Sequence, residues 1–179
     1  SLTISDKLSV LKALNKKDIS GSSPIIEEFE KALQKNFKAK KAVAVSNGSV
    51  ALDLAFQLAE LTNDDEVILP SFTIISCLSA VVRTGAKPVF CDVDPESWNM
   101  NLENVKKVFS NKTKAILMVH TYGLTAEARK IKEFCEANNI LLIEDSAEAH
   151  GQSSSEQLCG TFGSIATVSY THLTLPTIP

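Results

Sequence analysis

The sequence lacks most of the motifs from which a function can be assigned directly. It has no H-E-x-x-H metal motif, no G-x-S-x-G nucleophile turn, no P-loop and no G-x-G-x-x-G dinucleotide motif. No apolar run in its 179 residues approaches the ~20 residues that a membrane helix requires. The net charge of −3 provides no positive field for nucleic acid or anionic lipid. We therefore expect no metal site, no nucleic-acid partner and no membrane segment.

Cysteine pairs with the spacing of a metal or redox motif are also absent. The four cysteines, Cys77, Cys91, Cys135 and Cys159, form no C-x-x-C pair and match no zinc pattern. Scattered cysteines of this kind are typical of reduced thiols in a cytoplasmic protein. The opening segment, Ser1–Ser20, is charged and amphipathic and does not resemble a signal peptide. We therefore expect a cytoplasmic location.

The hydrophobic pattern that is present alternates between two kinds of run. Short apolar runs are typical of buried strands and cover Val43–Val45, Glu66–Leu69, Pro88–Val93, Ala115–Val119 and Ile140–Ile143. Longer runs with helical periodicity cover Pro24–Phe37, Ser49–Leu61, Thr73–Arg83, Leu102–Phe109 and Thr125–Asn138. This alternation predicts the α/β class, with a mainly parallel sheet and helices on both faces. We find no linker that would divide the chain.

Within these helices, some side chains have predicted positions. A stripe at Leu54, Leu58 and Leu61 is expected to face the core, as are Ile131 and Phe134 farther along. Asn101 is a plausible N-cap for the helix that follows it. Since ligands of such sheets bind beyond the carboxyl ends of the strands, polar residues just after strands are the candidates for function.

The first candidate segment is Ser46–Ser49, between a predicted strand and a predicted helix. Gly48 lets the backbone approach a ligand closely, and the following helix offers unpaired N–H groups and a positive dipole end. A phosphate would be well held there, with the Ser49 hydroxyl as a further donor. The alternative interpretation is a tight turn with a serine cap.

The second candidate is Asp145, which comes just after the apolar run Ile140–Ile143. A carboxylate at the carboxyl edge of the sheet could pair with a cationic ring nitrogen, and this pairing would keep both groups charged. The alternative is that Asp145 caps the next turn and Glu148 faces solvent. His120 and Tyr122 also follow a strand and could lie at the same edge of the sheet. A structural role for the histidine is the simpler interpretation.

Seven segments in order resemble one family over essentially Ser20–Thr167. They are SGSSPIIEEFEKAL, AVAVSNGSVALDLA, DEVILPSFTIIS, GAKPVFCDVDPESWNM, TKAILMVHTYG, IEDSAEAHG and CGTFGSIAT. The resemblance is to the DegT/StrS family of pyridoxal-phosphate (PLP) dependent sugar-nucleotide aminotransferases, and within it to the perosamine-synthase-like members. It implies PLP transferase fold type I, the aspartate-aminotransferase-like large domain. It also implies a homodimer with a shared active site, a nucleotide-linked 4-keto-6-deoxyhexose as substrate, and glutamate as amino donor.

The resemblance assigns roles to five residues. Gly48 and Ser49 would bind the cofactor phosphate, and Asp145 would pair with the pyridine nitrogen. Glu148 stands where many members have a glutamine that contacts the ring hydroxyl, and some members have glutamate there. Ile74 stands where many members place an aromatic residue against the ring, so aliphatic packing would replace stacking.

The end of the chain departs from the family pattern. After Gly160–Gly163 the family continues into a Ser-Phe segment and then the lysine that forms the Schiff base with PLP. Here no lysine follows Lys132, so the catalytic residue is unknown. We interpret residues 1–167 as the N-terminal part of the PLP-binding large domain, without the C-terminal small domain. Residues 168–179 are interpreted as a non-native, adapter-like tail, although Ser169 falls where the family has a phosphate-binding serine.

Two other functions stay open at this point. Some relatives carry histidine in place of the lysine and are PLP-dependent sugar dehydratases. A non-catalytic regulatory protein on the same fold is also compatible with the sequence. In every case we expect this fragment by itself to be inactive and poorly stable, because a parallel sheet that lacks strands has an open edge.

Overall fold

The computed structural model describes residues 3–169, and the chain divides into two compact units between Ala44 and Val45. The first unit contains α1 (Ile4–Lys16) and α2 (Pro24–Phe37). Thr3 caps α1 in a reciprocal arrangement with Asp6, in which each side chain accepts from the other residue's backbone N–H. In α2 the cap is Ser23, and Pro24 occupies the first helical position, where its missing N–H costs nothing. The observed bounds of α2 are those that the sequence predicts.

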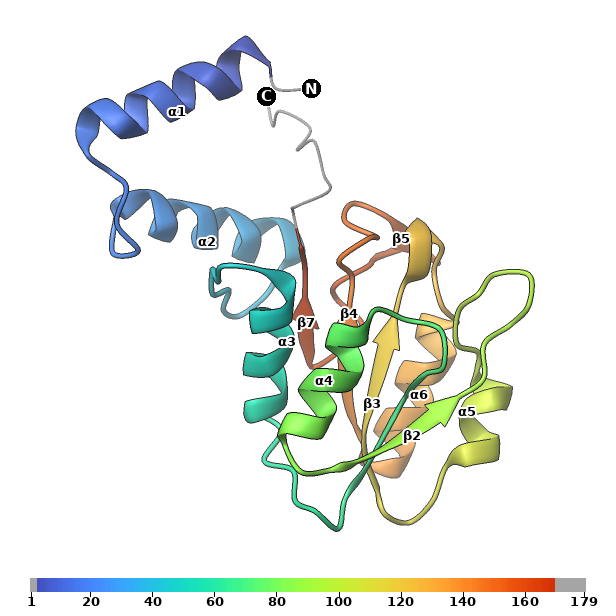
Figure 1. Cartoon of the computed structure of the whole chain (residues 1–179). Coiled ribbons are helices and arrows are strands. Elements are labelled where there is room, and N and C mark those ends of the chain that lie inside the picture. The colour runs from blue at the N-terminus through green and yellow to red at the C-terminus, as the bar shows by residue number, and fades with distance from the viewer. Residues whose placement is uncertain (1–2, 170–179) are drawn as a thin grey trace. The chain divides into compact units, whose positions relative to one another are not determined.

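The second unit, Val45–Ser169, alternates helices and strands along the chain (Figure 1). Its elements are α3 (Gly48–Gln57), β1 (Glu66–Pro70), α4 (Ile75–Arg83), β2 (Lys87–Cys91), α5 (Leu102–Val108), β3 (Thr113–Val119), η1 (Thr121–Gly123), α6 (Ala128–Asn138), β4 (Leu141–Asp145), β5 (Ser153–Ser154), β6 (Gln157–Leu158) and β7 (Ile165–Thr167). No helix among residues 3–169 is long and apolar enough to cross a lipid bilayer.

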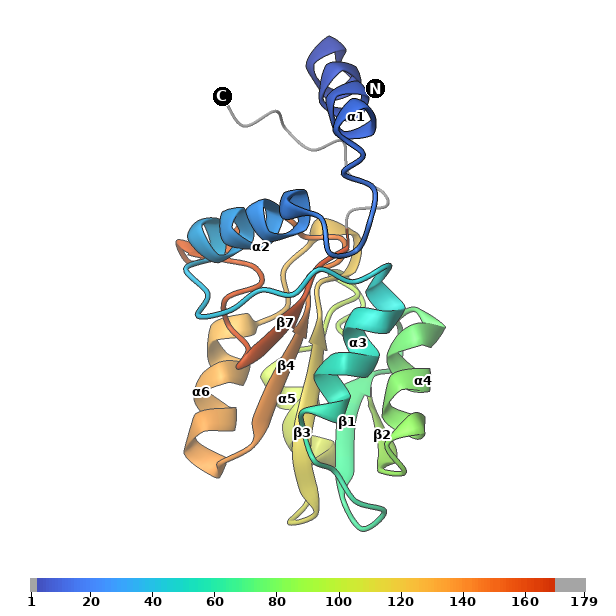
Figure 2. The same cartoon turned by 90° about the vertical axis from the view of Figure 1, so that its left-hand side faces the viewer.

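Five strands form one parallel sheet in the order β2-β1-β3-β4-β7. Helices α3 and α4 cover one face, and α5 and α6 cover the other (Figure 2). Alternate residues of β3 show why its sequence is apolar throughout. Ala115 and Leu117 pack under α3 and α4, whereas Ile116 and Met118 pack under α5 and α6. The predicted α/β class and the two covered faces are confirmed.

The predicted strand at Val43–Val45 is wrong. No strand is present there, and Val43 is 62% exposed. The N–H of Ala44 donates to the Glu30 side chain, at 2.8 Å, instead of a neighbouring strand. A three-residue apolar run is too short to identify a strand when no partner strand lies beside it.

The predicted core stripe of the first helix in this unit is wrong for Leu58, whereas Leu61 is partly buried against the core. The helix α3 ends at Gln57, and the residues that it buries are Leu52, Ala55 and Phe56. Leu58 is 65% exposed, because it lies beyond the last helical turn. Both Ile131 and Phe134 of α6 do pack in the core, as expected, although Phe134 is only partly buried. Asn101 caps α5 through its side-chain oxygen, also as expected.

Several predicted boundaries move by a few residues, but the strand end that matters for function agrees with the sequence. The fourth strand, β4, ends in Glu144 and Asp145, which follow the predicted apolar run Ile140–Ile143. Asp145 is therefore the last strand residue, paired in register with Val119 of β3 and Thr167 of β7. Both of its flanking strands end at the same level, so its side chain lies at the carboxyl edge of the sheet.

Candidate functional site

Asp145 is a buried acid at the carboxyl edge of the parallel sheet. Only 4% of the residue is exposed. Its Oδ1 accepts the Ala147 backbone N–H at 3.0 Å, and its Oδ2 lies 3.5 Å from the Cys77 sulfur in the first turn of α4. Side chains alternate along a strand, so Asp145 points to the α3 and α4 face.

Burial raises the pKa of Asp145 above its ordinary value of 3.8, and the hydrogen bonds from Ala147 and Cys77 oppose this effect. Among residues 3–169, no lysine or arginine forms an ion pair with this carboxylate. A buried acid without a cationic partner destabilises the fold when it is ionised. A ligand that brings a positive charge to Oδ2 would relieve that cost.

A serine-rich helix start lies at the same edge. Asn47 caps α3 by accepting the Val50 N–H at 3.0 Å, which leaves the amides of Gly48 and Ser49 without an intrahelical partner. The Ser49 hydroxyl lies 2.7 Å from the Ser76 hydroxyl in the first turn of α4. Unpartnered amides, hydroxyl donors and a positive helix end are the features of an anion site.

Gly48 allows close packing here. A Cβ on this glycine would lie 3.3 Å from the Ser169 Cβ and 3.6 Å from its hydroxyl oxygen. The backbone of α3 therefore approaches the residue two positions after β7. This contact places a third hydroxyl beside the helix start. The interpretation of residues 168–179 as a non-native tail stays a prediction, and residues 170–179 lie outside the described residues.

A short run of contacts joins the helix start to the buried acid. Ser49 contacts Ser76, Ser76 is adjacent in sequence to Cys77, and Cys77 contacts Asp145. The structure thus brings Ser49 and Asp145, far apart in sequence, to one edge of the sheet. It also brings Ser76 and Cys77 between them, and sequence reasoning missed both. Their position just after β1, at the start of a helix, was the available signal.

Ile74 and Glu148 lie in loops that follow β1 and β4. Ile74 is 64% exposed and precedes the first residue of α4, so the predicted helix start at Thr73 is two residues too early. Glu148 is exposed, and its Oε2 accepts the Tyr122 N–H at 2.6 Å. The structure shows no contact of either side chain with Asp145, and their roles toward a cofactor stay predictions.

His120 does not line the site, since it is fully buried. Its Nε2 lies 2.9 Å from the Glu144 Oε1, and its Nδ1 accepts the Ala126 N–H at 3.1 Å. Burial lowers the pKa of His120 and so favours the neutral ring, while hydrogen bonds with Cys159 and Glu144 oppose this effect. A second ring proton would displace the Ala126 contact, so we assign the neutral tautomer with its hydrogen on Nε2. The role is structural.

One group of metal-ligand residues is close together in the described part of the chain. His120, Glu144 and Cys159 have ligand atoms within 4.8 Å of one another, all buried. The Glu144 oxygens, however, already accept from the backbone N–H groups of Gly160, Phe162 and Gly163 at 2.6–2.9 Å, from the Ser146 hydroxyl and from His120. A metal ion would have to displace these bonds, so the group works as a hydrogen-bonded clamp.

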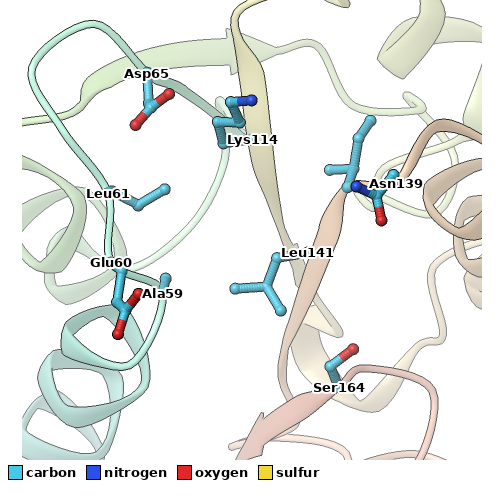
Figure 3. A pocket seen from close by; sticks show the side chains of 9 residues that line it. Ala59, Glu60, Leu61, Asp65, Lys114, Asn139, Leu141 and Ser164 are labelled. Carbon is cyan, nitrogen blue, oxygen red and sulfur yellow. The ribbon is translucent and has the colours of Figure 1, made fainter.

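A separate pocket lies at the other end of the sheet. Its volume is about 420 Å³, and its lining includes Asp65, Lys114, Leu141 and Ser164, which stand at or just before the starts of strands (Figure 3). The amino ends of parallel strands are not where ligands of such sheets bind. The pocket also contains neither a buried acid nor a helix N-terminus, and we do not assign the function to it.

The fold and the site together define an α/β domain with two features at one edge of a parallel sheet. One is an anion cradle at the start of α3, formed by Gly48 and Ser49, and the other is the buried acid Asp145. Residues 3–174 match the DegT/DnrJ/EryC1/StrS aminotransferase family, and the chain belongs to this family. It is 39% identical over 170 residues to a GDP-perosamine synthase from Escherichia coli O157:H7, covering 95% of this chain and 47% of that protein.

Solved structures give the same assignment of fold. An aminotransferase from Psychrobacter cryohalolentis has a TM-score of 0.90 and 33% identity, covering 95% of this chain and 43% of that one. A mutant GDP-4-keto-6-deoxymannose-3-dehydratase with bound GDP-perosamine has a TM-score of 0.84 and 26% identity, covering 90% and 43%. The chain therefore has the fold of these enzymes but spans less than half of their length.

Proposed function

We propose that the complete gene product containing this chain is a PLP-dependent aminotransferase that acts on a nucleotide-linked keto sugar. The observation that carries the proposal is the placement of Asp145 and the start of α3 at one sheet edge, joined through Ser76 and Cys77. PLP has a phosphate at one point of its ring and a basic nitrogen at another, so it suits an anion cradle and a buried acid.

The residues of this chain bind and orient the cofactor. The amides of Gly48 and Ser49 hold the phosphate, and the hydroxyl of Ser49 adds a donor. Asp145 keeps the ring nitrogen protonated by pairing with it in a buried site. Ile74 packs on the ring and Glu148 contacts the ring hydroxyl. When bound, PLP supplies an electron sink for moving an amino group.

The substrate class rests on the relatives. GDP-perosamine synthase and a dehydratase that binds GDP-perosamine both handle nucleotide-linked deoxysugars by their names. We propose a nucleotide-linked 4-keto-6-deoxyhexose as acceptor and glutamate as donor, in a homodimer with a shared active site. Four buried cysteines without disulfides fit a cytoplasmic enzyme. No lysine follows Lys132, so we propose that this chain alone is inactive.

The function is tested with the complete gene product. We expect it to bind PLP, with an absorbance band that changes on adding glutamate, and to aminate a GDP- or dTDP-linked 4-keto-6-deoxyhexose, detected by mass spectrometry. A complete gene product that binds no PLP would reject the proposal. PLP binding with loss of the C3 hydroxyl instead of amination would assign the dehydratase function, which the GDP-perosamine complex of the dehydratase relative supports.

The phosphate cradle gives a further prediction. Replacing Ser49 with Ala removes a hydroxyl donor from the helix start, and we expect PLP to bind about 10-fold more weakly in the complete gene product. Fluorescence titration with PLP measures this change. Ser164→Ala is the matched control, since Ser164 is exposed at the opposite edge of the sheet. Equal affinities for Ser49→Ala and wild type would remove Ser49 from the cradle.

A further inference from the structure

Cys77 is a buried group that the proposed function does not use. It lies in the first turn of α4, is 0% exposed, and directs its sulfur at Asp145 Oδ2 from 3.5 Å. The Thr73 hydroxyl donates to the same sulfur at 3.3 Å. With its acceptor role used by Thr73, the sulfur has its own hydrogen available for the carboxylate.

The direction of this hydrogen bond is set by the acidities of the two groups. Burial, followed by the negative charge of Asp145, raises the pKa of the Cys77 thiol to about 12. The thiol thus keeps its hydrogen at neutral pH, where it can donate to an ionised carboxylate. An ionised carboxylate has no hydrogen to give, so Cys77 is the donor.

We propose that Cys77 is a positioning residue for Asp145: its S–H holds Oδ2, as the Ala147 N–H holds Oδ1, and it favours the charged carboxylate that pairs with the cofactor ring. This inference rests on the proposed function. Both oxygens of the acid then have a donor from the protein before any ligand arrives.

Among the described residues, the other side-chain groups near Asp145 have smaller effects on it. The Thr167 hydroxyl of β7 also lowers the pKa of Asp145, but less than Cys77 does, and His120 after β3 is neutral in the tautomer assigned above. Glu144 is adjacent in sequence but points to the opposite face of the sheet, where the backbone of residues 160–163 holds it. Cys77 is therefore the side-chain donor with the largest effect on this acid.

The test compares Cys77→Val, which removes the donor and keeps the bulk, with Cys77→Ser, which keeps a donor. In the complete gene product we expect the pH at which PLP binding is lost on the acid side to rise by about half to one pH unit in Cys77→Val. Cys77→Ser should keep the wild-type midpoint or lower it. Cys135→Val, a buried cysteine under the opposite face, is the control and should leave the midpoint unchanged.

A second readout needs no cofactor. The folded-state pKa of Asp145 is raised, so the free energy of unfolding falls as pH rises above 3.8, the unfolded value. Without the thiol donor, this fall should be larger and extend to higher pH in Cys77→Val than in Cys77→Ser. Urea denaturation of the cofactor-free protein between about pH 4 and about pH 8 measures it.

The outcomes separate this inference from the proposed function. If wild type binds no PLP at any pH, the proposed function fails, and the cofactor-free denaturation still decides the role of Cys77. If Cys77→Val keeps the wild-type midpoint and the wild-type pH dependence of stability, the inference is wrong. Equal shifts in the valine and serine variants would also overturn it, because they would show a packing effect without a donor.

Discussion

Asp145→Asn is expected to weaken PLP binding by about 100-fold or more while making the cofactor-free protein more stable at neutral pH. Removing one partner of a buried ion pair costs about 3 kcal/mol or more, which sets the expected loss of affinity. The asparagine is nearly the same size and can still accept the Ala147 N–H through its oxygen. Packing at the end of β4 should therefore survive the substitution.

The gain in stability follows from the sign of the pKa shift. Burial raises the pKa of Asp145, so between 3.8 and the folded value the native protein binds more protons than the unfolded chain. The free energy of unfolding then decreases as pH rises through this window. Asparagine does not titrate, so the variant should lose this decrease and unfold at a higher urea concentration at neutral pH.

Fluorescence titration with PLP and urea denaturation measure the two effects on the same preparation of the complete gene product. Asp64→Asn is the control, because Asp64 is exposed in the loop before β1 and should change neither quantity. A variant that loses PLP and stability together would indicate that Asp145 is a structural cap. A variant that keeps the wild-type affinity for PLP would show that Asp145 does not contribute to PLP binding.

Glu144→Gln is expected to cost about 3 kcal/mol of folding free energy, the largest stability effect among these variants. The Glu144 carboxylate is fully buried and accepts from Gly160, Phe162 and Gly163, so both oxygens face N–H donors. An amide has one oxygen and one NH₂ group. In either orientation its NH₂ opposes at least one backbone donor, which leaves that donor buried and unpaired.

The clamp also has a pH signature. Burial raises the pKa of Glu144, but hydrogen bonds from His120 and the Gly160 and Gly163 amides outweigh burial and hold it below 4.5. The stabilisation is therefore present above pH 4.5 and is lost as pH falls through the lower folded value. Glu144→Gln should lack this acid-side loss.

Urea denaturation at neutral pH measures the cost, with Glu136→Gln as the control because Glu136 is exposed on α6. A decrease in the free energy of unfolding below about 1 kcal/mol would contradict the role of Glu144 in holding the backbone.

Much of the fold could be predicted because the apolar pattern of each segment agrees with the place of that segment in the folded sheet. Continuous apolar strands alternating with amphipathic helices predicted a parallel sheet covered on both faces, and the structure confirms this arrangement. The errors came where local pattern is weak. Val43–Val45 had too few residues to identify a strand. Leu58 is exposed because α3 ends at Gln57 instead of at the predicted Leu61.

The sequence by itself determined the family, the class of fold, and the two segments that carry Ser49 and Asp145. These depend on residue types at fixed spacings along the chain, which a sequence states directly. Only the tertiary structure decided that Ser76, Cys77 and Ser169 lie between or beside these two segments. It also decided that Glu144 accepts hydrogen bonds from a backbone loop instead of binding a ligand. Such contacts join residues far apart in the chain, and only the packing of α3, α4 and β7 around the sheet brings them within hydrogen-bonding distance.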